Sequence, residues 1–504
     1  METQSLQIIT ASNQWGALLP EIILGCFAVL ILFVDLLMPN LRRQIPRLSI
    51  LAQLLAAAVL YTTICANCER TGSDVYFGGL VAQNNASDWM RLFFLLGSIC
   101  VTHIGSVFLS RQSLAKVEFH HLVLVVTGAF MILVQSQHFI LLFVALETVT
   151  IGFYILVSYR RDSRASLEAG LKYLIMGAFS SGMLLFGVAL LYGAASNPEL
   201  PMAARHPLNF VELGTFIASS NELFNNSTNL MVLFGAVLVL TGICFKIGVV
   251  PFQIWIPDVY QGAPTPVTSF LAVSSKAAGF FLLYLLLDGP FAALGYMTTP
   301  LLTIVAIATL LFGNIAALGQ RNVKRIMGMS GVAHAGILLM GLLASLKVDW
   351  ALIAVFFYLV TYALASFGVF EVMAHVADVD DSDQDMDRYN DLLKREPYLG
   401  GVLLVSLGSL AGIPPLAGFM AKLLIFIAAF QAGLYWILGV ALAGVVISIY
   451  YYFGWMRSAV MDNPFLADQA PSSILPPRFG ARLMMGILAG LTIILGFYQG
   501  FFPF

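Results

Sequence analysis

An all-α polytopic membrane protein is the fold class that this sequence predicts, and three observations point to it. First, 59% of the 504 residues are hydrophobic and only 10% are charged, whereas soluble domains carry about 25% charged residues. Second, the apolar residues fall into runs long enough to span a bilayer, which takes roughly 17–25 residues. Third, prolines and lone charges interrupt several runs, as in transporters whose broken helices line a polar path.

The apolar runs predict about 14 transmembrane helices. The first run is expected to be a retained transmembrane helix, because it lacks a positive leader and is too long for a signal peptide. The expected spans are 17–38, 48–66, 90–109, 119–136, 139–159, 170–194, 230–250, 265–287, 298–318, 327–344, 350–375, 399–430, 434–456 and 482–502.

The seventh and twelfth expected helices carry helix-breaking sequences. Pro251 follows the seventh run at once, and a proline removes a backbone donor from the helical ladder. The twelfth run is too long for one straight span and contains the segment Gly412-Ile-Pro-Pro415. We therefore expect helices 7 and 12 to be broken.

The distribution of lysine and arginine predicts the orientation in the membrane. Eighteen of the 25 lie in loops after odd-numbered helices, four in loops after even-numbered helices and three inside helices. Because positive loops stay on the cytoplasmic side, both termini are expected on the periplasmic side. The same distribution favours an even number of helices.

Six ionisable residues lie inside or at the edge of the apolar runs, and charges at such depth are costly and mark functional sites by default. One acid, one histidine and several lysines suit a proton relay, because burial and a nearby carboxylate favour opposite protonation states of a lysine. Structural ion pairs or satisfied polar groups remain the alternative. The six residues are Glu147, Lys172, Lys246, Lys276, His334 and Lys422.

The six candidates differ in how isolated they are. Lys246 is the only charge between Leu230 and Asp258, so its stem is too short to snorkel to an interface. Lys172 is the weakest candidate, because Glu168 lies one helical turn before it and the two can form a surface pair. The sequence therefore favours the deep lysines over Lys172.

Other chemistry finds little support. No nucleotide-binding glycine motif, zinc-protease motif or nucleophile elbow occurs. No nucleic-acid partner is expected, because the sequence has no basic tail and no basic patch with interleaved aromatics, and the net charge of −2 is uninformative on this point. Cys65 and Cys68 form the only Cys-x-x-Cys pair, which predicts incidental cysteines or, alternatively, a disulfide or redox pair. The acidic segment 378–391 lacks the glycine and glutamate of a calcium-binding loop and predicts a solvated loop.

Several motifs resemble the antiporter-like subunits of respiratory complex I. The core match runs from Phe245 to Phe280, and the other motifs most resemble subunit N of NADH:quinone oxidoreductase, called subunit 2 in organelles. They are Leu19-Pro-Glu-Ile-Ile-Leu24, Lys172-Tyr-Leu-Ile-Met-Gly-Ala-Phe-Ser-Ser181, Lys324-Arg-Ile-Met-Gly-Met-Ser-Gly-Val-Ala-His334 and Gly412-Ile-Pro-Pro-Leu-Ala-Gly-Phe-Met-Ala-Lys422.

The resemblance implies two inverted five-helix repeats, formed by helices 4–8 and 9–13. The implied divisions are an N-terminal three-helix segment (1–118), a first repeat (119–290), a second repeat (291–456) and a C-terminal loop with helix 14 (457–504).

The resemblance also implies roles for the six residues. Glu147 pairs with Lys246, then Lys276 and His334 form the bridge, and Lys422 faces the exit. Lys172 matches a lysine of the family's sixth helix. Met327-Gly-Met329 stands where the family often has Leu-Ala-Tyr, which argues against a tyrosine contribution at that point.

The function implied is that of a non-redox, proton-translocating subunit of NADH:quinone oxidoreductase in the bacterial inner membrane, with a thylakoid membrane also compatible. Its partners would be other membrane subunits, the lipid bilayer and, through the parent complex, quinone. No cofactor or metal is expected on this chain; NADH, FMN and iron–sulfur clusters would belong to the parent complex. The alternatives are a Na⁺/H⁺ antiporter subunit or secondary cation/proton transporter of the same fold, and a purely structural arm.

Overall fold

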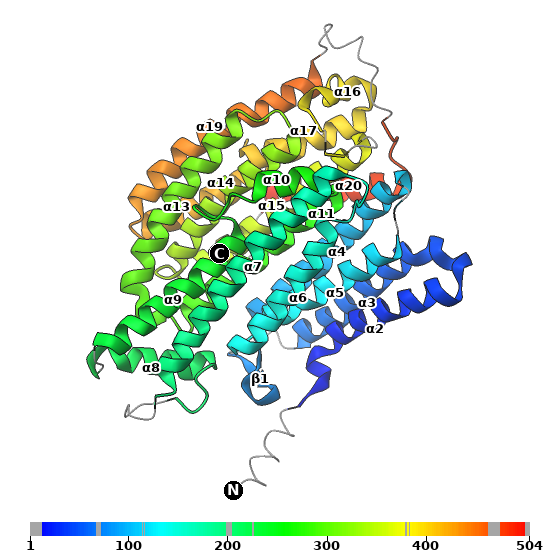
Figure 1. The fold of residues 1–504 in the computed structure, drawn as a ribbon. Helices are drawn as coiled ribbons and strands as arrows, with labels where there is room; N and C mark the ends of the chain where they lie inside the picture. The colour runs from blue at the N-terminus through cyan, green and yellow to red at the C-terminus, as the bar shows by residue number, and fades with distance from the viewer. Residues whose placement is uncertain are drawn as a thin grey trace.

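Long helices run side by side through the part of the chain that this computed structural model describes (Figure 1). The N-terminal helices α2 and α3 lie at one side of the bundle, and α13 and α19 lie at the other. The described residues are 13–66, 72–112, 114, 116–197, 204–223, 226–377, 381–382, 384–461 and 474–498.

Most of the chain is helical, as the composition predicts. The longer helices are α2 (Leu19–Leu37), α3 (Ile45–Ala66), α4 (Asn85–Arg111), α5 (Val117–Leu133), α6 (Phe139–Val157), α7 (Arg164–Ala195), α8 (Phe210–Leu223), α9 (Asn226–Ile247), α12 (Lys276–Asp288), α13 (Gly295–Leu318), α14 (Val323–Ser345), α15 (Ala351–Val376), α17 (Pro397–Ala411), α18 (Ala417–Gln431), α19 (Tyr435–Val460) and α20 (Phe479–Phe497).

The short elements lie between these helices. They are α10 (Ile256–Gly262), α11 (Thr265–Phe270), the π-helix η4 (Leu271–Ser275), α16 (Leu392–Arg395), the 3-10 helices η1 (Trp15–Leu18), η2 (Pro39–Gln44), η3 (Phe77–Gly79), η5 (Ala292–Leu294) and η6 (Met386–Tyr389), and the antiparallel strands β1 (Asp74–Tyr76) and β2 (Val81–Gln83).

The membrane-protein prediction is confirmed. Within the described residues, 12 helical segments are long and apolar enough to cross a membrane, and every predicted span overlaps a described helix. The small hairpin of β1 and β2 was not predicted, since its strands hold only three residues each. Cys68 lies outside the described residues, so the Cys65–Cys68 pair has no structural account.

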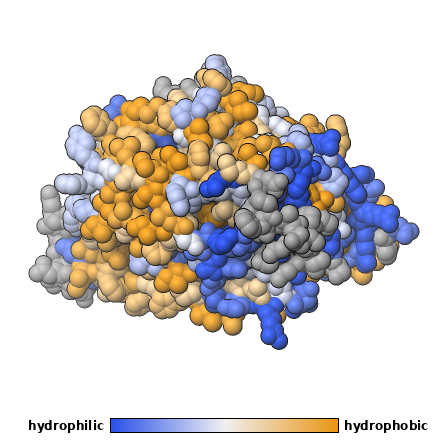
Figure 2. Space-filling view, turned by 90° about the horizontal axis from the view of Figure 1, so that it is seen from above, coloured by the Kyte–Doolittle hydropathy of each residue, from blue (hydrophilic) through white to orange (hydrophobic). Residues whose placement is uncertain are grey.

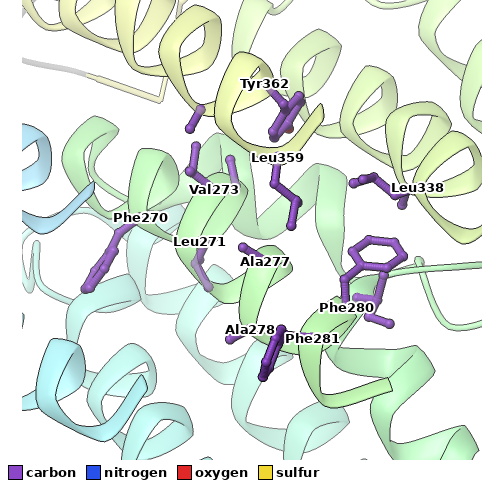
Figure 3. Packing of buried hydrophobic residues seen from close by; sticks show 14 of the residues in the cluster. Phe270, Leu271, Val273, Ala277, Ala278, Phe280, Phe281, Leu338, Leu359 and Tyr362 are labelled. Atoms are coloured by element: carbon purple, nitrogen blue, oxygen red, sulfur yellow. The ribbon is translucent and has the colours of Figure 1, made fainter. Parts of the chain in front are cut away.

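Helix α14 forms the centre of the bundle, because the whole of its apolar window is buried against other helices. Beside it, Leu359 and Tyr362 of α15 lie over the segment Phe270–Phe281, whose aromatic and aliphatic side chains fill the space between the helices (Figure 3). Outer helices instead expose apolar side chains, and Figure 2 shows a broad hydrophobic surface next to a hydrophilic zone. This distribution fits a protein whose outside contacts lipid.

Both predicted helix breaks are present. Helix α9 ends at Ile247, one residue after Lys246, and Gly248 follows with φ +76°, a conformation that favours glycine. The chain then passes through α10 and α11 into the π-helix η4, which was not predicted. The second break separates α17 from α18 and begins at Gly412, with φ +86°.

Two charges that the sequence placed in loops are buried in helices instead. Lys324 lies in the first turn of α14 with no exposed surface, and its Nζ is 2.7 Å from Asp381. Asp381 also accepts hydrogen bonds from the backbone N–H and hydroxyl of Thr265, both at 2.8 Å. The prediction of a solvated acidic loop is therefore wrong for Asp381, because its carboxylate neutralises a buried lysine.

Arg91 is the other misplaced charge. It lies in α4, buried, and its guanidinium contacts Glu21 of α2 through two 2.8 Å hydrogen bonds. Asp88 lies 3.0 Å from the same guanidinium. A bidentate pair of this kind fixes the packing of two helices, so Arg91 joins α2 to α4.

Candidate functional site

Glu147 and Lys246 meet where α6, α7 and α9 converge. Lys246 is buried, and its Nζ donates a 2.6 Å hydrogen bond to Thr150 Oγ1. Thr150 lies one turn after Glu147 on α6, and Glu147 accepts a hydrogen bond from Ser181 of α7 at 2.5 Å. Within the described residues Glu147 and Lys246 form no ion pair of 4.0 Å or less, and Lys246 instead contacts Thr150, which lies on the same face of α6 as Glu147.

Lys276 begins α12, directly after the π-helix. Its Nζ donates a 2.6 Å hydrogen bond to the carbonyl oxygen of Gly331 in α14 and lies 5.2 Å from the centre of the Tyr362 ring. A Cβ on Gly331 would come within 2.8 Å of this Nζ. Glycine at this position therefore lets the ammonium group reach the backbone of the central helix.

The two lysines Lys246 and Lys276 come from helices in direct contact. Gly279, one turn after Lys276, packs so closely on Ile247 that a Cβ there would lie 2.9 Å from the isoleucine side chain. Ile247 is the residue after Lys246. The end of α9 therefore rests on the start of α12.

His334 is held by two tyrosines. Its Nδ1 lies 2.6 Å from the Tyr358 hydroxyl of α15, and its Nε2 lies 3.1 Å from the Tyr452 hydroxyl of α19. The Tyr362 ring, which also contacts Lys276, lies 5.1 Å from the imidazole, measured between ring centres. Tyr362 thus connects the surroundings of Lys276 and His334.

Lys422 lies buried at the second break. Its Nζ donates hydrogen bonds to the carbonyl oxygens of Leu410 (2.8 Å) and Ala411 (3.0 Å), the last two residues of α17. A helix leaves its last carbonyls without intrahelical partners, so the broken end supplies acceptors for the ammonium group. Among the described residues, no carboxylate lies within 4.0 Å of this nitrogen.

Two small cavities separate His334 from Lys422. One is also lined by Asn314, Ser448 and Tyr451, and the other is also lined by Tyr358 and Ser409. Both have polar groups in their walls and room for a water-sized molecule. The space between the imidazole and the lysine can therefore carry a hydrogen-bonded chain.

Lys172 is not part of this buried series. It lies near the start of α7, partly exposed, and forms ion pairs with Glu168 (2.7 Å) and with Asp258 of α10 (2.6 Å). Arg325 also contacts Asp258, at 3.1 Å. Burial favours a raised pKa for Asp258, but the hydrogen bonds and charges of Lys172 and Arg325 outweigh it and hold the pKa below its usual value.

The tyrosines beside His334 were missed at the sequence level. Met329 indeed leaves no tyrosine on α14, but Tyr358 and Tyr452 reach His334 from other helices. Their signal was weak, because tyrosines are common in apolar helices. Thr150 and Ser181 were missed for the same reason. Within the described residues no group of three or more histidine, cysteine or carboxylate side chains has an arrangement that could hold a metal ion.

Sequence comparison places these residues in a known family. The family model described as NADH:quinone oxidoreductase/Mrp antiporter, TM matches residues 136–448. NADH-quinone oxidoreductase subunit N 1 of Opitutus terrae is 50% identical to the chain, covering 99% of this chain and 98% of that protein. NADH-quinone oxidoreductase subunit N of Chlorobium chlorochromatii is 34% identical, covering 99% and 94%.

Structural comparison gives the same result. A chain of respiratory complex I from Thermus thermophilus with bound Aureothin superposes with a TM-score of 0.76 at 29% identity, covering 96% of this chain and 98% of that one. A chain of the Mrp complex from Dietzia sp. DQ12-45-1b superposes with the same TM-score at 20% identity, covering 95% and 94%, which shows a shared fold. The chain thus belongs to the antiporter-like membrane subunits, and within them to the subunit N family of NADH-quinone oxidoreductases.

Proposed function

We propose that this chain is a non-redox subunit in the membrane arm of a bacterial NADH:quinone oxidoreductase and that it moves protons across the inner membrane. Its partners are the other membrane subunits of that complex and the surrounding lipid. NADH, FMN, iron–sulfur clusters and quinone belong to the parent complex. The chain contributes a path for protons, with both termini on the periplasmic side as the positive loops predict.

The observation that carries the proposal is the series of buried basic groups Lys246, Lys276, His334 and Lys422. Each has a protein oxygen as hydrogen-bond partner, and neighbouring members come from helices that pack on one another. Burying a charged group is costly even when it has a hydrogen-bond partner, so four such groups in series favour a function in charge transfer over a purely structural one. Each group can bind one proton and release it to the next.

Glu147 sets the state of the first lysine. An ionised Glu147 favours the charged form of Lys246, and burial favours the neutral form. A small movement of the carboxylate relative to Thr150 would therefore load or empty Lys246. The proton would then pass through Lys276 and His334 and leave by Lys422.

Lys172 takes a different part in this proposal. Its ion pair with Asp258 ties α7 to α10, immediately after the first break. We therefore place Lys172 at the rim of the entry, where it supports the break, and outside the series that exchanges protons.

The test is proton pumping by the complete complex in proteoliposomes. Replacing Lys246 by alanine is expected to lower the number of protons pumped per electron, and Lys422→Ala is expected to do the same. A Lys246→Ala complex that pumps the wild-type number of protons per electron would disprove the proposed mechanism. Sodium-dependent proton exchange by the chain without redox partners would instead favour the cation/proton antiporter.

A further inference from the structure

A second group of buried ionisable side chains lies apart from the relay, where α4, α15 and α20 pack together. Glu371 of α15 has no exposed surface. His103 of α4 brings its Nδ1 to 3.1 Å from the Glu371 carboxylate, and His375, one turn further along α15, brings its Nε2 to 3.7 Å. None of the three belongs to the series that ends at Lys422.

The Glu371 carboxylate lacks hydrogen bonds. The two histidines approach at ion-pair distance, with His375 too far away for a hydrogen bond, and neither Glu371 oxygen has a hydrogen-bond partner among the described residues. A buried carboxylate without donors is costly. Two imidazole rings lie close enough to supply a proton to this carboxylate.

The cluster lies close to the surface of the protein. Arg111 donates hydrogen bonds to the carbonyl oxygens of His375 (3.2 Å) and Ala377, and the backbone N–H of Leu475 also donates to His375, at 3.0 Å. These contacts close the end of the bundle over Glu371. The His103 side chain keeps 18% of its surface exposed, so its imidazole joins the buried carboxylate to the outside.

A series of close contacts also leads from the cluster toward Lys276. Phe367 lies one turn before Glu371, and a Cβ on Gly97 of α4 would lie 3.6 Å from the Phe367 ring and 3.2 Å from Ser274 Oγ. Ser274 belongs to the π-helix and lies two residues before Lys276. Its buried hydroxyl has no partner among the described residues, and such groups are ordinarily satisfied by water.

We propose that Glu371, with His103 and His375, forms a second proton-uptake site, which takes protons from the face where α4 and α15 end and delivers them past Ser274 to Lys276. The inference rests on the proposed function, because Lys276 must belong to a proton path. Among the described residues, Cys100 of α4 also interacts with Glu371, and Arg111 of α4 interacts with His375. By the positive-loop argument this face is cytoplasmic.

The experiment measures the pH profile of the NADH:quinone rate and of proton pumping in the complete complex carrying Glu371→Gln. When protons are plentiful, entry at Lys246 suffices, so the variant should match the wild type in mildly acidic buffer. In alkaline buffer its rate and pumping should fall by about 10-fold, a modest share of what positioned proton transfer supplies. His103→Gln should show the same alkaline loss, and Glu371→Asp should restore part of the rate.

The matched control is Glu118→Gln, the same change at an exposed glutamate in the first turn of α5, which should keep the wild-type profile. A Glu371→Gln complex that loses the same factor at every pH, or loses nothing, overturns the proposal. If Glu371→Gln prevents assembly, His103→Gln decides alone, because its ring lies at the rim. If the Lys246→Ala complex pumps normally in the same experiment, the proposed proton relay itself is contradicted. If the Glu371→Gln complex is normal and the Lys246→Ala complex is defective, only the proposed second uptake site is contradicted.

Discussion

The two helix breaks of this chain differ in the contacts that hold them. Ion pairs are present at the first break, whereas the second is held by close packing. After the first break, Asp258 joins α10 to Lys172 and Arg325, and Asp381 joins α11 to Lys324. Charged contacts therefore anchor the first break, together with close glycine packing, since a Cβ on Gly262 would lie 2.4 Å from the carbonyl oxygen of Ala165.

The second break is held by close packing of glycines. A Cβ on Gly418 would lie 2.0 Å from the carbonyl oxygen of Ser409, and a Cβ on Gly496 of α20 would lie 1.9 Å from that of Pro415. These distances leave no room for any side chain at either position. Steric contacts therefore hold the second break.

The lysines at the two breaks, Lys246 and Lys422, also differ in the groups that surround them. Lys246 lies one residue before the end of the helix that precedes its break and contacts Thr150, one turn after Glu147 on α6. Lys422 follows its break, contacts carbonyl oxygens of α17, and faces the cavities beside His334. The comparison indicates that a nearby charge controls the first lysine, whereas the shape of the break and its cavities controls the second.

The largest effect is expected for Glu147→Gln, which removes the charge that distinguishes the first site. Positioned proton transfer contributes roughly 10²–10⁴-fold, so pumping through this subunit should fall within that range. Proton pumping by the reconstituted complex checks it, with Glu147→Asp as the matched variant that keeps the charge. Unchanged pumping would remove the distinction between the two lysines.

Asp381→Ala should destabilise the first break most. Removing one partner of a buried ion pair costs about 3–5 kcal/mol, because the other charge stays buried; here Lys324 would lose its carboxylate. Thermal unfolding of the purified complex, followed at this subunit, measures the loss. The double variant Lys324→Met/Asp381→Ala should recover much of the stability, and no recovery would contradict the ionic anchor.

Gly418→Ala tests the steric anchor of the second break. Overpacking a tight contact costs about 1–3 kcal/mol, and the backbone oxygen of Ser409 cannot rotate away as a flexible side chain could. The same measurement of thermal unfolding applies. Gly439→Ala on α19, where a Cβ meets nothing within 4 Å, is the control, and equal effects of both changes would refute the packing argument.

Tyr358→Phe should have a smaller effect, on the step between the two regions. It removes the hydroxyl 2.6 Å from His334 Nδ1 and leaves the ring in place. A hydrogen bond of this kind contributes about 0.5–1.5 kcal/mol. We therefore expect the pumping rate to fall by the factor to which this free energy corresponds. Tyr452→Phe, at the longer 3.1 Å contact, should lose less, and the reverse order would mean that Nε2 carries the step.

The smallest effect is expected for Asp258→Asn at the rim of the first break. Partly exposed ion pairs contribute about 0–1 kcal/mol. Because the pKa of Asp258 is held below its usual value, its contribution is present above the pKa of an unfolded aspartate and is lost as the pH falls through the folded pKa. Unfolding at neutral pH and in strong acid should therefore show a small difference that disappears in acid.

Sequence reasoning predicted most of the bundle, because bilayer-length apolar runs and prolines at breaks report on local physics. It also predicted that Lys246, Lys276 and Lys422 are buried, since each is a lone charge in an apolar run. It missed Tyr358 and Tyr452, whose role depends on which helices meet around His334.

The sequence was least informative near the ends of helices. Asp381 was assigned to a solvated loop because it lies in an acidic stretch, and only its tertiary contact with Lys324 shows that both residues are buried. Glu371 was overlooked because His375 follows it and a polar loop begins soon afterwards. Depth in the membrane cannot be inferred from local composition where a helix is about to end.

The π-helix η4 has a consequence for comparing sequences. A π turn holds one residue more than an α turn, so the side chains of α11 are offset by about 100° from the positions that a continuous α-helix ending at Lys276 would give them. If residues 265–288 are treated as one regular α-helix, the residues Thr265–Phe270 are therefore placed on the wrong faces of that helix. A relative that lacks one residue between Leu271 and Ser275 should keep both faces intact, and the gap would mark the π turn.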